Sequence, residues 1–341
     1  MRVLIVNTSE QKGGAAIAAS RLMHALRAEG VEARMLVRDT DHPSALVHRV
    51  HGHWKGRLRF LWERVVIWAA NRFTRRNLFK VSIANTGFDI TRLPEFQEAD
   101  VVHLHWINQG FLSLRDLRKI LLSGKRVVWT LHDMWPATAI CHHAYACEAY
   151  HVACHDCPFL AAPGRNDLSA RVFRQKQRTY GGLHPNLSVV AVSRWLAERV
   201  KESALLGEKP RDIIPNTLSL DNFDLLDRTE SRRELGLADR RYILLFGAAR
   251  IDDPIKGFEF LRAAIECLLQ RGEYRREELH LLLFGQIKDE HLLDDFPISH
   301  TEMGVVRDTH LISRLYSAAN VTISTSHYET FGQTMVEAQA C

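Results

Sequence analysis

The sequence predicts an α/β protein with two successive domains, each built on a parallel sheet that helices cover. Its 341 residues are too many for one ordinary domain and enough for two. Short apolar runs typical of buried strands alternate with helical patterns, and the alternation pauses in a polar stretch, residues 217–240, before it resumes. We therefore expect a first domain at 1–220, a linker within 217–240 and a second domain at 221–341.

The first half opens with a strand–helix–strand pattern. Val3–Asn7 is an apolar run typical of a buried strand, a loop over Thr8–Gly14 follows, and the helical pattern Ala15–Ala28 ends before Gly30. Val31–Val37 is the next strand, which completes a βαβ unit. Further elements of the first half are strands at Val101–His105, Val127–Leu131 and Val189–Ser193 and a helix at Leu112–Leu122.

The second half repeats the alternation. Its predicted elements are strand Tyr242–Phe246, helix Gly257–Gln270, strand Leu279–Phe284, helix Thr309–Ala319 and strand Val321–Ser324. A last helical pattern, Thr334–Ala340, follows Gly332. Ligands of such sheets bind at the carboxyl ends of the strands. We therefore expect binding residues in the loops after the strands, in a cleft between two facing domains.

Composition narrows the class of protein. With 46% hydrophobic and 25% charged residues, the chain is globular. No stretch approaches the roughly 18 uncharged apolar residues of a membrane span. Arg2 begins a strand pattern instead of the basic segment of a signal peptide. We therefore expect a cytoplasmic protein.

The net charge of +5 is unevenly spread, and basic residues concentrate in residues 52–80. This stretch holds eight basic residues against one acidic residue, Glu63, with tryptophans and other apolar residues between them. A basic, tryptophan-bearing amphipathic helix suits an anionic membrane surface, which would place the protein peripherally at the inner face of the membrane. A helix packed on its own domain with a solvated basic face is an equally good interpretation. We expect no nucleic-acid partner.

Two glutamates near the end of the chain, Glu329 and Glu337, are separated by seven residues. Glu329 follows a predicted strand, and Glu337 lies in the helical pattern that starts after Gly332. The start of a helix offers unpaired N–H groups and a partial positive charge, which suit a phosphate. The spacing therefore predicts two carboxylates that face one ligand at a helix N-terminus.

Cations and glycines occur in comparable loops. Arg250 and Lys256 follow a predicted strand, where two fixed cations can stabilise a departing diphosphate. Gly13 and Gly14 precede the first helix, where glycines let backbone N–H groups approach a phosphate. A tight turn explains the glycine pair equally well, and solvated surface is the common fate of arginine and lysine. No glycine follows at the spacing of a nicotinamide or flavin fingerprint.

Histidines gather at the end of two predicted strands. His132 ends one strand, and His103 and His105 end the preceding one. A histidine at a strand end beside a cleft can polarise a substrate hydroxyl or accept its proton. A capping or core histidine is the alternative interpretation.

Four cysteines fall within residues 141–157, an insertion in the first domain. Cys141, Cys147, Cys154 and Cys157 have the spacing C-x5-C-x6-C-x2-C. In a reducing cytoplasm this pattern favours a structural zinc site with four thiolates over disulfides, with free thiols as the alternative. The triplet Asp39-Thr40-Asp41 is interpreted as a turn, so no catalytic metal is expected.

Taken together, these residues resemble the retaining GT-B glycosyltransferases of family 4. The glycine pair, His132, Arg250 with Lys256, and the E-x7-E segment with Phe331-Gly332 carry the resemblance, which covers nearly the whole chain in order. The stretch HLHWINQGFLSL, followed by TLHDMW and the cysteine cluster, is similar to the branch that acts in bacterial exopolysaccharide synthesis, including colanic-acid-type enzymes. The resemblance implies two Rossmann-like domains facing across a cleft.

The matching positions imply roles for individual residues. In the first domain, Gly14 next to Gly13 would approach the donor diphosphate, and His132 would contact the transferred sugar or help to orient the reacting groups. In the second domain, Arg250 and Lys256 would bind the diphosphate. Three further contacts are implied there: Glu329 to hydroxyls of the donor sugar, the backbone of Phe331 and Gly332 to the phosphate, and Glu337 to the ribose.

The implied reaction is retaining transfer from a UDP- or GDP-sugar to a glycan or lipid-linked oligosaccharide, without a protein nucleophile or a metal. The leaving phosphate would take the acceptor proton, and Arg250 and Lys256 would stabilise it. Family members continue beyond the position of Cys341 with another strand and helices, so the resemblance also implies an incomplete second domain with apolar surface left uncovered.

Three other functions share part of the pattern. A sugar-nucleotide epimerase has the same architecture and needs no acceptor. A glycoside hydrolase using Glu329 and Glu337 would require a set separation of two carboxylates, which a carboxylate inside a helix makes harder to meet. A non-catalytic, zinc-stabilised scaffold would explain the cysteines and residues 52–80, but it leaves the second half unexplained.

Overall fold

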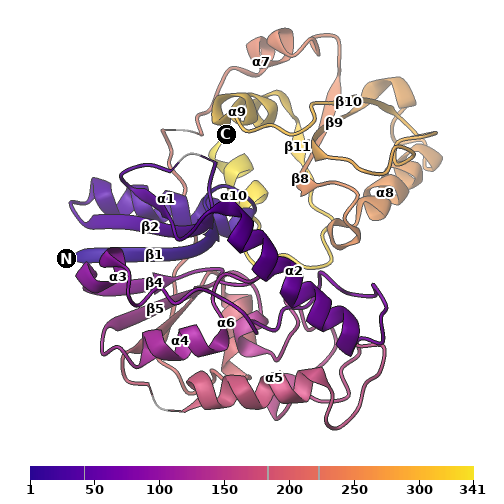
Figure 1. Cartoon of the computed structure of the whole chain (residues 1–341). Coiled ribbons are helices and arrows are strands. Elements are labelled where there is room, and N and C mark those ends of the chain that lie inside the picture. The colour runs from indigo at the N-terminus through magenta and orange to yellow at the C-terminus, as the bar shows by residue number, and fades with distance from the viewer. Residues whose placement is uncertain (42, 183, 222) are drawn as a thin grey trace. The chain divides into compact units, whose positions relative to one another are not determined.

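The computed structural model describes residues 1–41, 43–182, 184–221 and 223–341. They form two compact units, Met1–Thr217 and Leu218–Cys341. Within the described ranges each unit contains one sheet, and its paired strands all run parallel (Figure 1). The predicted α/β class, with parallel sheets in two domains, is therefore confirmed.

The sheet of the first unit has seven strands in the order β3-β2-β1-β4-β5-β6-β7. Their bounds are β1 Arg2–Ser9, β2 Glu32–Asp39, β3 Val47–Arg49, β4 Val101–Leu104, β5 Arg126–Leu131, β6 Leu187–Ala191 and β7 Arg211–Ile213. The strand order changes direction between β1 and β4, where Val3 pairs with Ala33 on one side and Val101 on the other. Loops after β1 and β4 diverge at such a switch point, which leaves room for a ligand.

Helices connect the strands of this sheet. Their bounds are α1 Gly14–Ala28, α2 His53–Ala70, α3 Pro94–Glu98, α4 Leu114–Leu121, α5 Leu168–Lys176 and α6 Arg194–Lys201. Capping residues set several of the helix starts. Ser113 caps α4 in a reciprocal capping box with Asp116, and Asp167 caps α5 by accepting from the Ala170 N–H.

The central strands are buried on both faces, as their continuous apolar runs predict. Every residue of β1 after Arg2 is buried. Trp129 of β5 is fully buried, and its Nε1–H donates to the His105 carbonyl at 3.0 Å. That bond fixes the chain where β4 ends relative to β5, so it positions the histidines that follow these strands.

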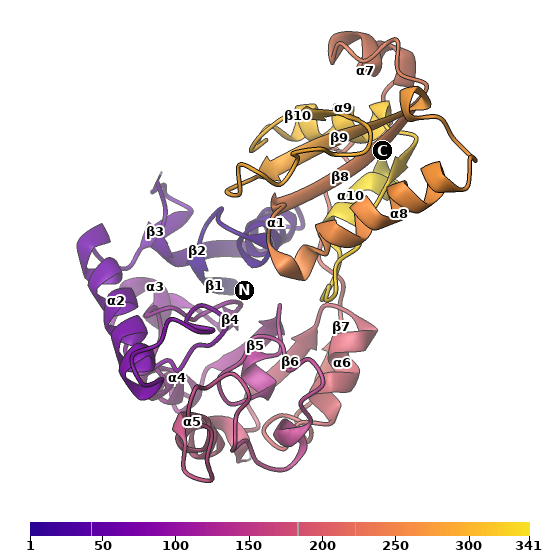
Figure 2. The same ribbon diagram turned by 90° about the vertical axis from the view of Figure 1, so that its right-hand side faces the viewer.

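The second unit contains a four-stranded sheet in the order β10-β9-β8-β11. Its strands are β8 Tyr242–Arg250, β9 Leu279–Gln286, β10 Ser299–Glu302 and β11 Val321–Thr322, and its helices are α7 Arg228–Glu234, α8 Phe258–Gln270, α9 Thr309–Ala318 and α10 Gln333–Ala340. Apolar residues of α8 pack with one face of β8 and β9, and those of α9 pack with the other. Figure 2 shows α8 running alongside β8.

Residues 218–240 differ from their prediction as a linker. They contain α7, and both Phe223 and Leu237 are buried in the core beside Leu245 and Leu315. Arg232 of α7 donates to the Ala318 carbonyl at 2.9 Å. Its few apolar side chains anchor a segment in which most residues are polar, so its composition was misleading. The predicted strand Val321–Ser324 is also shorter, since β11 ends at Thr322.

Candidate functional site

The glycine pair lies where β1 leads into α1 in the first unit. Gly13 is the residue before the helix and has a φ of +95°, a conformation that side chains disfavour. A Cβ on Gly13 would meet no atom within 4 Å. The backbone around Gly13 therefore borders open space, while the N–H groups of Ala16 and Ile17 donate to the Gly13 carbonyl.

Three histidines meet at the carboxyl ends of β4 and β5. The Nδ1 of His105 lies 2.9 Å from Nε2 of His132, and the ring centroids of His103 and His105 are 4.5 Å apart. His103 Nε2 lies 2.8 Å from the hydroxyl of Thr130. Burial lowers the pKa of His103 and of His132 to about 4, and it lowers the pKa of His105 well below its ordinary value. All three rings are therefore neutral at pH 7.

Asp133, which follows His132, organises a second network that the sequence reasoning missed. Its Oδ2 accepts from Trp106 Nε1 at 2.8 Å and lies 2.7 Å from His142 Nδ1, while Oδ1 accepts from the Trp135 N–H at 2.8 Å. Burial acts to raise the pKa of Asp133, but the charge and hydrogen bond of His142 and the Trp135 N–H hold that pKa at about 2. The sequence signal was a carboxylate directly after a strand-end histidine.

In the second unit, two loops at the carboxyl ends of β8 and β11 are bonded together. The hydroxyl of Thr325 donates to the carbonyls of Gly257 at 2.7 Å and Lys256 at 3.1 Å, and the His327 N–H donates to the Ile255 carbonyl. Lys256 Nζ then lies 2.9 Å from Glu329 Oε2. The structure thus brings together two residues that the sequence had proposed separately.

Arg250 lies at the end of β8 and faces two aspartates. Its Nε is 3.5 Å from Asp252 Oδ1, and its Nη2 is 3.4 Å from Asp253 Oδ2. Arg250 Nε and Asp252 Oδ1 are both buried without a hydrogen bond of good geometry. Arg250 is thus ion-paired with both aspartates, and 38% of its side chain stays exposed to solvent.

The two glutamates of the E-x7-E segment have different surroundings. Glu329 is partly exposed, whereas Glu337 of α10 is 7% exposed and accepts from the Tyr316 hydroxyl at 3.2 Å. Gly332 comes directly after Phe331, has a φ of +78° and immediately precedes α10. The left-handed glycine makes the sharp turn from the loop into the helix.

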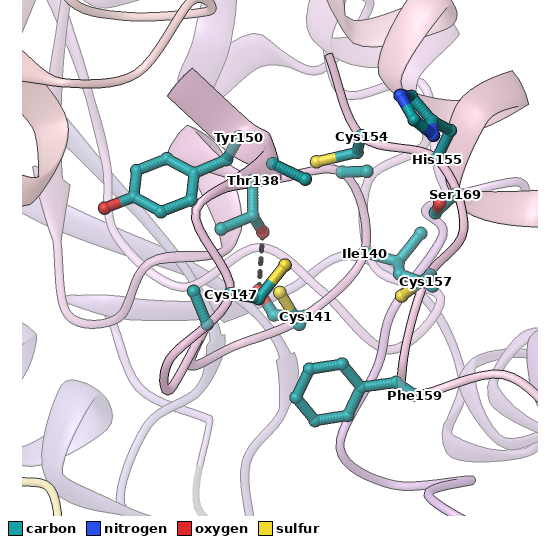
Figure 3. Close-up of a pocket in the computed structure, with 13 residues that line it drawn as sticks. Thr138, Ile140, Cys141, Cys147, Tyr150, Cys154, His155, Cys157, Phe159 and Ser169 are labelled. Carbon is teal, nitrogen blue, oxygen red and sulfur yellow. Dashed lines mark hydrogen bonds between the residues drawn. The ribbon is translucent and has the colours of Figure 1, made fainter. Parts of the chain in front are cut away.

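The four cysteines line one small pocket in the first unit, and all of them are free thiols. In Figure 3 their sulfur atoms point into this pocket from different sides. Burial raises the pKa of Cys141 and Cys154 to about 12 and that of Cys157 to about 11. Among the residues described, however, no three cysteine, histidine or acidic side chains lie close enough together to hold a metal ion.

Both aspartates of the predicted turn Asp39-Thr40-Asp41 form ion pairs with basic residues. Asp39 is the last residue of β2 and pairs with Arg38, and Asp41 lies 3.9 Å from Lys12. The prediction of a turn over Asp39-Thr40-Asp41 is therefore wrong for Asp39, which the sheet includes.

Helix α2 has a buried polar side and an exposed apolar side. Glu63 is fully buried, accepts from the N–H groups of Ile83 and Ala84 and pairs with Arg64 at 3.1 Å. Large apolar side chains of α2 are exposed to solvent: Trp54, Leu58, Leu61, Trp62, Val65 and Trp68. None of the helices within the described ranges has the length and apolarity needed to cross a bilayer.

Comparison with known families gives two matches along the chain. A family model described as Glycosyltransferase Family 4 matches residues 12–222, and one described as Glycosyl transferases group 1 matches residues 240–341. Each unit therefore matches a family of sugar-transferring enzymes, in the order that the sequence resemblance predicted.

Curated relatives carry related names. D-inositol 3-phosphate glycosyltransferase of Geodermatophilus obscurus is 29% identical over 258 residues, which is 71% of this chain and 50% of the relative. A protein of Escherichia coli K12 provisionally named colanic acid biosynthesis glycosyl transferase WcaC is 32% identical over 66 residues, 18% of this chain and 16% of that protein. The matched part of this chain thus spans about half the length of the Geodermatophilus relative and a smaller share of the Escherichia coli one.

Two solved structures share the fold. Sucrose-phosphate synthase of Thermosynechococcus elongatus has a TM-score of 0.61 and 20% identity, covering 100% of this chain and 79% of that one. Anabaena Alr3699/HepE in complex with UDP and glucose has a TM-score of 0.57 and 16% identity, covering 100% and 78%. At these identities the likeness shows the fold, which is the GT-B architecture that the resemblance implied.

Proposed function

Because the chain belongs to glycosyltransferase family 4, we propose that it transfers a sugar from a UDP- or GDP-sugar to a growing exopolysaccharide or a lipid-linked oligosaccharide. The family makes the chain a transferase. Donor and acceptor are the proposal, supported by the UDP and glucose bound in the Anabaena structure and by the short match to the colanic acid relative.

The observation that carries the proposal is the pair formed by Lys256 and Glu329 at the carboxyl ends of β8 and β11. A lysine cation can bind diphosphate oxygens, and a carboxylate can accept hydrogen bonds from two vicinal hydroxyls. Arg250, which is partly exposed beside Asp252 and Asp253, supplies a second cation in the same unit. One loop cluster therefore offers groups for both ends of a sugar diphosphate.

These groups suit a retaining mechanism in which the donor phosphate acts as the base. As the bond from the sugar to the phosphate oxygen breaks, negative charge grows on the diphosphate, and Lys256 and Arg250 would stabilise it. The leaving oxygen would take the proton of the acceptor hydroxyl on the same face of the sugar. The proposed roles of Gly14, Phe331 with Gly332, and Glu337 are backbone contacts to phosphate and a carboxylate contact to the ribose.

Calorimetric titration of the full chain with UDP and GDP tests this proposal. We expect binding of one nucleotide to weaken at least about tenfold in Lys256→Ala and in Arg250→Ala, which corresponds to the loss of one charge-assisted contact. Arg276→Ala is the matched control, because Arg276 is exposed and precedes β9, at the amino end of that strand. Equal affinity in all three variants would contradict the assignment of this loop cluster.

A peripheral membrane contact through residues 52–80 is a second part of the proposal. The single acidic residue of the stretch, Glu63, is buried, so the exposed charges of α2 and the following loop are basic. Exposed tryptophans beside basic residues match an anionic lipid surface. Sedimentation with phosphatidylglycerol vesicles should capture the protein, and Trp54→Ser with Trp62→Ser should release it. Phe260→Ser, an exposed aromatic of α8, is the control.

A structural zinc ion at the four cysteines remains a separate proposal. Their gathering around one pocket supports it, although the thiols would have to turn toward each other to bind an ion. Because the thiols must lose protons, zinc uptake should strengthen as pH rises. Metal analysis should find about one zinc per chain, lost in Cys154→Ser and kept in Cys267→Ser, whose cysteine is exposed on α8. A metal-free wild-type protein would exclude the site.

A further inference from the structure

We infer that His105 holds His132 in a single neutral tautomer, with the proton on Nδ1, so that His132 presents an N–H donor at the carboxyl edge of the first sheet. His105 is thus a positioning residue for His132. The inference assigns His132 the role of hydrogen-bond donor and excludes it as a general base.

The contact between the two rings permits two arrangements of protons. His105 Nδ1 and His132 Nε2 are 2.9 Å apart, a normal hydrogen-bond distance. Since both rings are neutral, one proton lies between the two nitrogens. Either His105 donates from Nδ1 to a bare His132 Nε2, or His132 donates from Nε2 to a bare His105 Nδ1.

The surroundings of His105 distinguish these arrangements. The side chain of His105 is 3% exposed, and its Nε2 is buried without a hydrogen-bond partner. If His132 were the donor, His105 would carry its own proton on this Nε2 and bury an N–H group with no acceptor. Buried N–H groups without acceptors are rarer in proteins than acceptors without donors. His105 is therefore the donor, and its Nε2 is bare.

The second ring nitrogen of His132, Nδ1, determines what this tautomer can bind. With Nε2 bare and bonded to His105, the proton of His132 is on Nδ1. Among the described residues Nδ1 has no hydrogen-bond partner, and it is not one of the buried unpaired atoms. A neutral N–H at this position can donate to an oxygen lone pair, but it cannot accept a proton. A phosphate oxygen or a sugar hydroxyl is the ligand group that fits.

Neighbouring groups favour the neutral ring. Burial dominates the lowered pKa of His132, and the adjacent Asp133 opposes it only in part. Asp133 is itself satisfied by His142, Trp106 and the Trp135 N–H, so no proton needs to be shared with it. The carboxylate charge of Asp133 is therefore stabilised by these three groups.

The identity of the oxygen that His132 contacts rests on the proposed glycosyl transfer, whereas the tautomer does not. In that reaction the leaving phosphate takes the acceptor proton, so a donor at His132 is consistent with the chemistry and a base would be redundant.

Long-range ¹⁵N–¹H correlation spectra of the full chain, labelled with ¹⁵N-histidine and recorded at pH 7, measure the tautomer directly, because protonated and bare ring nitrogens have well-separated ¹⁵N shifts. His132→Gln identifies the His132 signals by their loss. We expect the Nδ1–H form of His132 in at least about tenfold excess, given the penalty for an unpaired buried N–H. A predominant Nε2–H form would overturn the inference.

Two variants of His105 test the positioning role. Asn places an amide N–H near the position of Nδ1, so His105→Asn should preserve the tautomer of His132. His105→Phe has no donor and should reduce the excess by at least about fivefold. An unchanged tautomer in His105→Phe would show that His105 does not set it. If His105→Phe does not fold, the wild-type spectrum and His105→Asn still decide.

Binding of UDP and UDP-glucose then tests the ligand. In His132→Asn, which keeps a donor near Nδ1, the ratio of the two affinities should stay within about twofold of wild type, and in His132→Phe UDP-glucose should lose at least about fivefold relative to UDP. An unchanged ratio in His132→Phe would contradict a contact with the sugar. Failure of every variant and of wild type to bind either compound would sink the proposed donor and leave the tautomer standing.

Discussion

Gly257 holds together the two loops that carry Lys256 and Glu329, and Gly257→Ala should separate them. Gly257 has a φ of +61°, and a Cβ there would lie 2.3 Å from the carbonyl oxygen of Thr325. A left-handed alanine costs about 1–2 kcal/mol. Carbon–oxygen contacts need roughly 3.3 Å, so the Thr325 loop must move by about 1 Å.

That movement would break the bonds from the Thr325 hydroxyl to the carbonyls of Gly257 and Lys256. The two carbonyls share the single hydroxyl proton, so the loop shift loses one hydrogen bond and adds about 0.5–1.5 kcal/mol to the backbone cost. Gly257→Ala should therefore destabilise the second unit by about 1.5–3.5 kcal/mol. It should also weaken UDP or GDP binding, because Glu329 moves away from Lys256.

Gly272→Ala is the matched control, since Gly272 has a φ of +68° and a Cβ there meets nothing within 4 Å. It carries the backbone cost without the clash. Urea unfolding followed by far-UV circular dichroism compares the variants, with tryptophan fluorescence as a reporter of the first unit, which contains all seven tryptophans. Equal unfolding free energies for the two variants, within about 0.5 kcal/mol, would refute the reasoning.

Two further predictions concern the first unit. Glu63→Ala should lower its unfolding free energy by about 3–5 kcal/mol, since it leaves the buried charge of Arg64 without a carboxylate and the N–H groups of Ile83 and Ala84 without an acceptor. Denaturation of Glu63→Ala beside exposed Glu29→Ala measures this, and equal stability would contradict it. The pKa of His103 and His132 is about 4, below the unfolded value near 6.5, so the unfolded chain binds more protons between these pH values. Stability should therefore fall from about pH 6.5 to pH 4, by up to about 3 kcal/mol per histidine. Fluorescence-detected unfolding at several pH values checks it: the slope should flatten in His103→Gln, and an unchanged slope would refute the assignment.

Much of the fold was predictable because parallel strands, buried on both faces, leave continuous apolar runs in the sequence. Val3–Asn7 and Leu279–Phe284 are such runs, and both lie within observed strands. The short strand β3 and the strand β10 were missed, since Ser299–Glu302 is polar and lies at the sheet edge, where neighbours demand little burial. Residues 218–240 were misjudged because their buried apolar residues, such as Phe223 and Leu237, are few and lie among polar ones.

Residue types at strand ends determined the candidate site from sequence alone. Arg250, Lys256, Glu329 and His132 could be chosen because carboxyl ends of parallel strands converge at one edge of a sheet. Their partners could not be chosen, since hydrogen bonds such as that between Thr325 and Gly257 join residues 68 positions apart. Only the tertiary structure decided that Lys256 pairs with Glu329 and that Glu337 is buried against Tyr316. It also decided that His105 Nδ1 contacts His132 while His105 Nε2 is buried without a partner. Sequence sets which chemical groups are present, whereas burial and distance, which depend on packing across the whole unit, set their protons and partners.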